Sequence, residues 1–192
     1  YTGCQIGYLK NGNITSCNVS GTISIDIESA GDGYSSLSGC YGGIVGELRD
    51  GKSITDCQFD GSISISAPGS QSSIDNGVGG IGGTIHADGI KNLTNNGIIE
   101  CTDGESHASG IAAGLYTDYD PSGATVTGLF NNGNVSSAKG STAGIAYWLS
   151  CGAIENCHNT GDIRHSGERA SSFGITSDAH FMTARNCSNR GS

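Results

Sequence analysis

The chain has 192 residues, with 33 glycines, two prolines and only 14% charged side chains, against about 25% in an average soluble domain. Glycine does not recur at every third position and isoleucine is frequent, so collagen and disordered linkers are excluded. The net charge of −9 is spread singly along the chain and disfavours nucleic acid as a partner, and no stretch reaches the roughly 18 apolar residues of a membrane span.

Six degenerate copies of one pattern follow one another along the chain. The second half of each copy has an apolar residue, then Cys or Leu three residues later, then Gly after four more and, in the first five copies, Ile or Val after a further two. This half keeps its spacing while the distance between copies varies, which predicts loops inserted between stacked strands. Each copy opens with an Ile next to a Gly, namely Ile6, Ile44, Ile81, Ile111, Ile145 and Ile175.

The repeats are rich in Gly, Ile, Val, Thr, Ser and Asn, a composition that favours strands and tight turns over helices. We expect three short strands per copy, at Gly-Ile, at Ile-x-x-Cys and from Gly-x-Ile onward, with Asn-x-Gly supplying the positive φ of a corner. The polar segments 26–38, 64–77, 100–107 and 117–122 are expected to be external loops. The prediction is all-β: a right-handed, single-stranded parallel β-helix (β-solenoid) of about six coils, with residues 1–192 forming one domain of a larger protein.

Coils stacked at about 4.8 Å would place equivalent residues in columns inside the fold. The opening isoleucines would form the first column. Because one repeat has too little apolar area to fold alone, stability would be a sum over neighbouring interfaces. The second column would be Cys17, Cys57, Leu93, Leu129, Cys157 and Cys187, and the third Ile23, Ile63, Ile99, Val135 and Ile163.

The best-preserved copies resemble a known motif. Gly-Gly-Ile-Val-Gly at residues 42–46 with Ile-Thr-Asp-Cys at 54–57, and Ile-Glu-Asn-Cys at 154–157, are similar to the GLUG motif. Such repeats occur in large bacterial surface proteins, including adhesin-like proteins and non-catalytic regions of IgA-cleaving metallopeptidases. The resemblance covers nearly the whole chain, although Thr2-Gly3-Cys4-Gln5 replaces the opening glycines and Ala184 replaces Ile in the sixth copy. It implies an extracellular, cell-surface location and brings no catalytic residues.

Two glycine motifs match nucleotide-binding patterns by residue type alone. Residues 46–53 fit Gly-x-x-x-x-Gly-Lys-Ser, but no helix is expected to follow, and Glu47 and Asp50 stand where an anion would bind. Residues 77–82 fit Gly-x-Gly-x-x-Gly without a surrounding βαβ pattern. Both are interpreted as ordinary repeat sequence, so no cofactor-binding residue is predicted.

No catalytic or metal-binding residue is predicted, and the chain is not expected to be an enzyme. The histidines form no His-Glu-x-x-His motif and are expected on the surface, and Asp118 and Asp120 are too few for calcium. Carbohydrate-cleaving β-helices cluster carboxylates on one strand face. Here the acids occur in single copies and are not expected to share a column: Asp56, Asp60, Glu155 and Asp162.

The eight cysteines fall into two groups. Four lie in the second column, where Leu replaces Cys in two copies, so they are expected to be buried free thiols. The other four are off that column, and a Cys4–Cys40 bridge between neighbouring coils is one alternative for them. This second group is Cys4, Cys40, Cys101 and Cys151.

The leading hypothesis is a non-catalytic extracellular domain of a bacterial surface protein, serving adhesion or ligand binding, or acting as a spacer. Its partner would be a host glycan or protein. The candidate ligand-contacting side chains are aromatic and could stack on a sugar, or they could pack over loop roots: Tyr116, Tyr119, Tyr147 and Trp148. The alternative is an accessory β-helix of a secreted polysaccharide lyase, glycosidase or peptidase.

Overall fold

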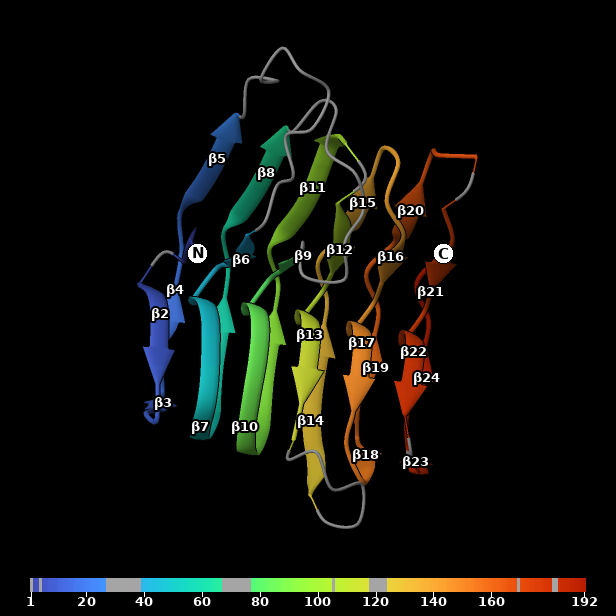
Figure 1. Ribbon diagram of the computed structural model, residues 1–192. Helices are drawn as coiled ribbons and strands as arrows, with labels where there is room; N and C mark the ends of the chain where they lie inside the picture. Colours follow the sequence, from blue (N-terminus) through green and yellow to red (C-terminus); the bar gives the residue numbers. More distant parts are fainter. Residues whose placement is uncertain are drawn as a thin grey trace.

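The computed structural model describes residues 2–3, 5–26, 39–66, 77–104, 106–117, 124–168, 170–180 and 183–192. Every regular element in these ranges is a β-strand, and the strands form three sheets whose pairings are all parallel. Figure 1 shows the strands of successive repeats side by side in sequence order, from blue at the N-terminal end to red at the C-terminal end. The predicted all-β class is therefore confirmed, with parallel sheets.

Sheet A contains one strand from each of the six repeats, and sheet C contains one from each of the first five, both in sequence order. Sheet A consists of β1 (Thr2–Gly3), β6 (Cys40–Gly42), β9 (Gly77–Gly79), β12 (His107–Ser109), β16 (Thr142–Ala143) and β21 (Ser172–Phe173). Sheet C consists of β5 (Thr22–Asp26), β8 (Ser62–Ser66), β11 (Ile98–Asp103), β15 (Val135–Ser137) and β20 (Ile163–His165). Ser64–Ser66 and Glu100–Asp103 had been expected in loops, but the third strand continues through them because their backbone pairs with the neighbouring repeat.

Sheet B holds the first and second strands of every repeat. In repeats two and three these strands merge into β7 (Val45–Phe59) and β10 (Gly82–Asn95). The first strands elsewhere are β2 (Ile6–Lys10), β13 (Ala112–Tyr116), β17 (Ala146–Ser150) and β22 (Thr176–His180). The second strands are β3 (Asn13–Thr15), β4 (Asn18–Val19), β14 (Thr125–Asn131), β18 (Ala153–Glu155), β19 (His158–Asn159), β23 (Thr183–Arg185) and β24 (Ser188–Asn189).

The strand register confirms the second and third predicted columns. Leu93 pairs with Cys57 on one side and Leu129 on the other, and the neighbouring pairs Asn18↔Gln58, Phe130↔His158 and His158↔Ser188 align the remaining cysteines. The third column runs without interruption through Ile23, Ile63, Ile99, Val135 and Ile163. Both columns belong to the hydrophobic core that the three sheets surround.

The first predicted column is wrong at its first member. Gly3 pairs with Gly42 and Ile6 with Val45, so position 5 rather than position 6 corresponds to Ile44. The two flanking strand pairs fix this register, so Gln5 takes the column position in the first copy, which lacks the opening glycines. Gln5 is exposed there. The remaining five members are joined by backbone hydrogen bonds from each N–H to the next carbonyl, at 2.9–3.0 Å: Ile44, Ile81, Ile111, Ile145 and Ile175.

The corner between the second and third strands lies at Asn-x-Gly, as predicted: β10 of sheet B ends at Asn95 and β11 of sheet C begins at Ile98. The expected positive φ is found there only at Gly21 of the first copy. Positive φ occurs one residue before the Cys/Leu column, with values of 50° to 70°, at Ser16, Asp56, Asn92, Gly128, Asn156 and Asn186. Short polar side chains and Gly tolerate this left-handed conformation best, which explains the residue types in this position.

The asparagine of Asn-x-Gly instead points into the core. Asn95, Asn131 and Asn159 are fully buried, and each donates from Nδ2 to the Oδ1 of the next asparagine at 2.7 Å, the last acceptor being Asn189. Each Nδ2 of the three also donates to the carbonyl of the glycine two residues later, at 2.9–3.1 Å. Those glycines approach the previous repeat so closely that a Cβ on Gly133 would collide with the carbonyl of Gly97.

Replacing Asn131 by Ala is expected to destabilise the protein by roughly 2–3 kcal/mol. The change leaves the Nδ2 of Asn95 without its acceptor and the Oδ1 of Asn159 without its donor, and both groups are buried. Urea unfolding measures the effect. The control is Asn132→Ala in the same repeat, whose side chain is exposed and should change stability by about 0.5 kcal/mol or less. Equal effects for the two variants would contradict a stabilising role for the buried row.

Candidate functional site

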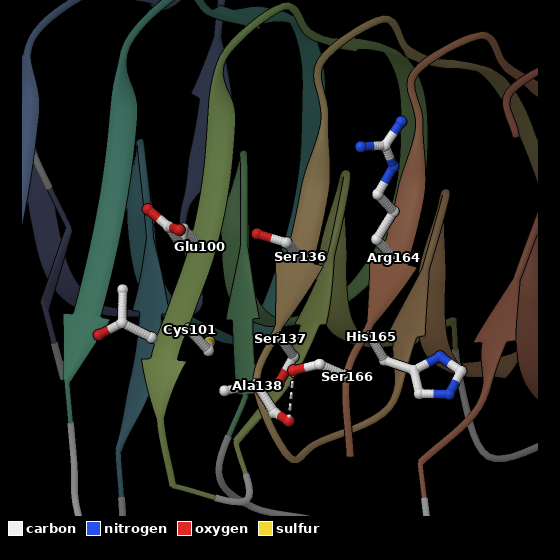
Figure 2. Close-up of a pocket in the computed structure, with 9 residues that line it drawn as sticks. Glu100, Cys101, Ser136, Ser137, Ala138, Arg164, His165 and Ser166 are labelled. Carbon is white, nitrogen blue, oxygen red and sulfur yellow. Dashed lines mark hydrogen bonds between the residues drawn. The ribbon is translucent and has the colours of Figure 1, made fainter. Parts of the chain in front are cut away.

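A hollow of about 380 Å³ lies on sheet C, across repeats three to five. Figure 2 shows one row of its side chains projecting from three neighbouring strands, Glu100 from β11, Ser136 from β15 and Arg164 from β20. Because paired parallel strands are about 4.8 Å apart, the carboxylate and the guanidinium emerge about 10 Å apart with one hydroxyl between them. The full lining is Glu100, Cys101, Thr102, Ser136, Ser137, Ala138, Arg164, His165 and Ser166.

The second row of lining side chains is Cys101, Ser137 and His165, and it goes from buried to exposed along the stack of repeats. Cys101 is buried in the core, and burial raises the pKa of its thiol to about 12, so the thiol stays protonated at neutral pH and is a poor nucleophile. Ser137 is also buried and donates its hydroxyl to the carbonyl of Ser106 at 3.0 Å. His165 is exposed, with its Nδ1 2.8 Å from the hydroxyl of Ser172.

The polar groups of the hollow differ in how firmly they are held. Thr102 and Ser166 donate their hydroxyls to the carbonyls of Ile65 and Ala138, at 3.3 and 3.0 Å. Arg164 uses one nitrogen for an exposed ion pair with Asp162 at 2.8 Å, and a guanidinium has five N–H donors in all. The hollow therefore presents a carboxylate, a serine hydroxyl and a guanidinium to solvent, with an imidazole at its edge.

The predicted ligand-contacting aromatics lie elsewhere, on sheet B. Trp148 stacks on His180 with ring centroids 4.8 Å apart, and its strand partner is Gly114. The ring of Tyr116 lies over Gly114, where an added Cβ would be 2.8 Å from it, so Tyr116, Trp148 and His180 are neighbours. We call these three residues the aromatic row. All three are half-buried.

Tyr147 does not join the aromatic row. It stacks on His107 of sheet A, with centroids 3.8 Å apart and ring planes 9° apart. His107 is only 9% exposed, so the expectation that all the histidines lie on the surface is wrong for this one: the stacked tyrosine covers it. Tyr119 lies outside the described residues, as do Asp118 and Asp120. None of the aromatics in the described ranges lines the hollow.

The glycine motifs occur in strands rather than in anion-binding loops. Residues 46–53 lie within the 15-residue strand β7, and no helix follows in the described part of the chain. Glu47 is buried there and forms an ion pair with Arg49 at 2.8 Å. Residues 77–82 run from β9 across the bend into β10. In the described part of the chain, neither segment is followed by the helix N-terminus through which these two motifs bind phosphate.

Four acidic side chains that a carbohydrate-cleaving site could use lie in four different columns. Asp56 accepts a hydrogen bond from Asn92, and Asp60 accepts from Asn96 and Gln58, which lowers the pKa of Asp60. Glu155 pairs with Arg185 at 2.7 Å, and Asp162 accepts from Ser192, which lowers the pKa of Asp162. Each acid is thus bound to a neighbouring repeat. Among the described residues, no group of three or more His, Cys, Asp or Glu side chains could hold a metal ion.

No family model matches the chain, and comparison with curated proteins and with solved structures also found no match. The part of the chain that the structure describes contains no helix that could cross a membrane.

Replacing Asp103 by Asn is expected to reduce stability at pH 7 but not in acid. Asp103 and Lys139 follow two lining residues of the hollow and form an ion pair at 2.9 Å. The hydrogen bond that Lys139 donates is the main cause that lowers the pKa of Asp103 below its ordinary 3.8. The hydrogen bond from the N–H of Gly104 lowers this pKa further. This stabilisation is present above the ordinary pKa and is lost as the pH falls through the lowered one.

Because both side chains are exposed, the Asp103→Asn effect at pH 7 should be below about 1 kcal/mol, and it should shrink toward zero near pH 2. Urea unfolding at both pH values measures it. Asp88→Asn, an exposed acid on β10, is the control and should change stability at neither pH. A difference that persists unchanged in acid would show that the charge of Asp103 is not its source.

Proposed function

We propose that this chain is a non-catalytic β-solenoid domain of the GLUG type, from a bacterial cell-surface protein, that binds a glycan outside the cell. Three observations support the solenoid: each repeat contributes to all three sheets where the chain continues, every pairing is parallel, and equivalent residues stack in register. The coil is proposed to be right-handed, the usual sense of parallel crossovers. The extracellular location rests on the motif at residues 42–46 and 154–157.

The observation that carries the binding function is the hollow on sheet C. Its exposed groups are a carboxylate, a hydroxyl and a guanidinium at the regular spacing of parallel strands. Sugar hydroxyls can donate to Glu100 and exchange hydrogen bonds with Ser136, while Arg164 can bind a carboxylate through two parallel N–H donors. This arrangement favours an oligosaccharide with an isolated carboxylate for Arg164, rather than a polyanion that the net charge of −9 would repel.

The alternative functions have less support from the same surface. An accessory β-helix of a polysaccharide lyase or glycosidase would be expected to gather its acids on one strand face, whereas Asp56, Asp60, Glu155 and Asp162 occupy separate columns. A pure spacer would need no hollow. The aromatic row is a second surface on which a sugar ring could stack.

A glycan array with the purified chain is expected to show binding to acidic oligosaccharides. Arg164→Ala should weaken that binding about tenfold or more, because a charge-assisted hydrogen bond contributes roughly 1.5–3 kcal/mol. Arg190→Ala is the matched control, since Arg190 is exposed and does not line the hollow.

Three other results would change the assignment. A loss of binding in Trp148→Ala, with Arg164→Ala unaffected, would move the site to the aromatic row. Equal losses in Arg164→Ala and Arg190→Ala would indicate nonspecific attraction to positive charge. An array without any signal would contradict the binding role and favour the spacer.

A further inference from the structure

The Cys/Leu column contains two pairs of adjacent thiols, one toward each end. Cys17 is aligned with Cys57, and Cys157 with Cys187, while Leu93 and Leu129 fill the positions between the pairs. All four cysteines are free thiols in this structure. In-register partners on parallel strands have Cα atoms about 4.8 Å apart, which lies inside the range of about 4.4–6.8 Å that disulfides span.

The four side chains also have the same orientation. Each Sγ donates to the carbonyl oxygen of the residue two positions earlier in its own repeat, at 3.7, 3.1, 3.4 and 3.2 Å for Cys17, Cys57, Cys157 and Cys187. Because the same contact recurs in all four of these repeats, the sulfur atoms are stacked along the column rather than turned to opposite sides. A bond between neighbours then needs side-chain rotation and no change of strand register.

We propose that Cys17–Cys57 and Cys157–Cys187 are two oxidisable pairs that form disulfides between neighbouring repeats when the chain meets a small-molecule disulfide such as oxidised glutathione.

The column makes this pairing specific. Cys57 has Cys17 on one side and Leu93 on the other, and Cys157 has Leu129 on one side and Cys187 on the other. Within the column, each of these thiols therefore has one cysteine neighbour. The main competitor is Cys151, a buried thiol close enough to Cys157 to act on it electrostatically. Its sulfur is directed to the carbonyl of Ala153, at 3.4 Å, outside the column.

Accessibility sets the order of the reaction. Cys17 and Cys187 are half-buried, whereas Cys57 and Cys157 are at most 1% exposed. The thiolate of Cys17 or Cys187 therefore attacks first and forms a mixed disulfide, releasing one glutathione thiolate. The buried partner then loses its proton to solvent and attacks the protein sulfur of the mixed disulfide, releasing the second thiolate. The net change is oxidation of two protein thiols and reduction of one glutathione disulfide.

The second step should be slow at neutral pH. Burial raises the pKa of Cys57 to about 11 and of Cys157 to about 12, and the neighbouring thiol adds to the rise in both. Only a small fraction of each buried thiol is therefore ionised at neutral pH, so raising the pH should accelerate closure. The bonds would close loops of about 40 and about 30 residues and restrict the unfolded chain, which favours a more stable folded state.

The test is oxidation of the purified, reduced chain in glutathione buffers, followed by alkylation and tryptic peptide mapping. Cleavage after Lys and Arg separates the partners well. Cys187 is the only cysteine of peptide 186–190 and Cys57 the only one of peptide 53–91. Their partner peptides, 140–164 and 11–49, each hold two cysteines, which fragmentation distinguishes.

The expected products are the Cys17–Cys57 and Cys157–Cys187 links, formed faster at higher pH, with a higher urea midpoint for the oxidised chain. Cys187→Ser should abolish only the second link, and Cys151→Ser should retain both. Mixed disulfides without links, or a Cys151–Cys157 link in place of Cys157–Cys187, would overturn the proposal. The readout needs no glycan, so its outcome is independent of the proposed binding function.

Discussion

Every backbone amide in the paired strands must find its hydrogen-bond partner in a neighbouring repeat, because parallel strands provide none within one repeat. This requirement fixes the register, and the register stacks equivalent residues of successive repeats at about 4.8 Å. Each position must then tolerate a similar residue above and below. Isoleucine meets this condition through apolar contact, and asparagine meets it by donating to one neighbour and accepting from the other. An uncompensated row of carboxylates would fail, and Asp60 accordingly is followed by Asn96 and Asn132.

The columns that the sequence predicted correctly are those in the half of the repeat with constant spacing. There, Cys57, Leu93 and Leu129 keep one distance from a following glycine, so alignment alone gives their register. The first strand lacks such a marker. Ile6 was aligned by its neighbouring glycine, although strand pairing sets it against Val45. For the same reason the core column through Leu9, Leu48, Ile85, Leu115 and Leu149 was not predicted.

Residue type alone could not separate the two roles of asparagine or locate the hollow. Asn92 has a positive φ within β10 and Asn95 is in the buried row, three positions apart in one repeat. Glu100, Ser136 and Arg164 share no chemistry, so no motif marks them. Their common feature is positional, since each follows a member of the third column by one residue. The aromatics were selected for their chemistry, and the structure packs Tyr147 and Trp148 against histidines in different places.

The buried asparagine row has a direction. In each link from Asn95 to Asn189, the donating side-chain N–H points toward the C-terminal repeats and the accepting side-chain oxygen toward the N-terminal ones. Dipoles aligned in this way add along the row and strengthen one another, as they do in other hydrogen-bonded chains in a low-dielectric interior. Val19 and Phe59 hold the same position in the first two repeats, so this addition begins only at the third. The core is therefore electrically polarised along the direction in which the repeats stack, from the third repeat onward, although none of the asparagines carries a charge.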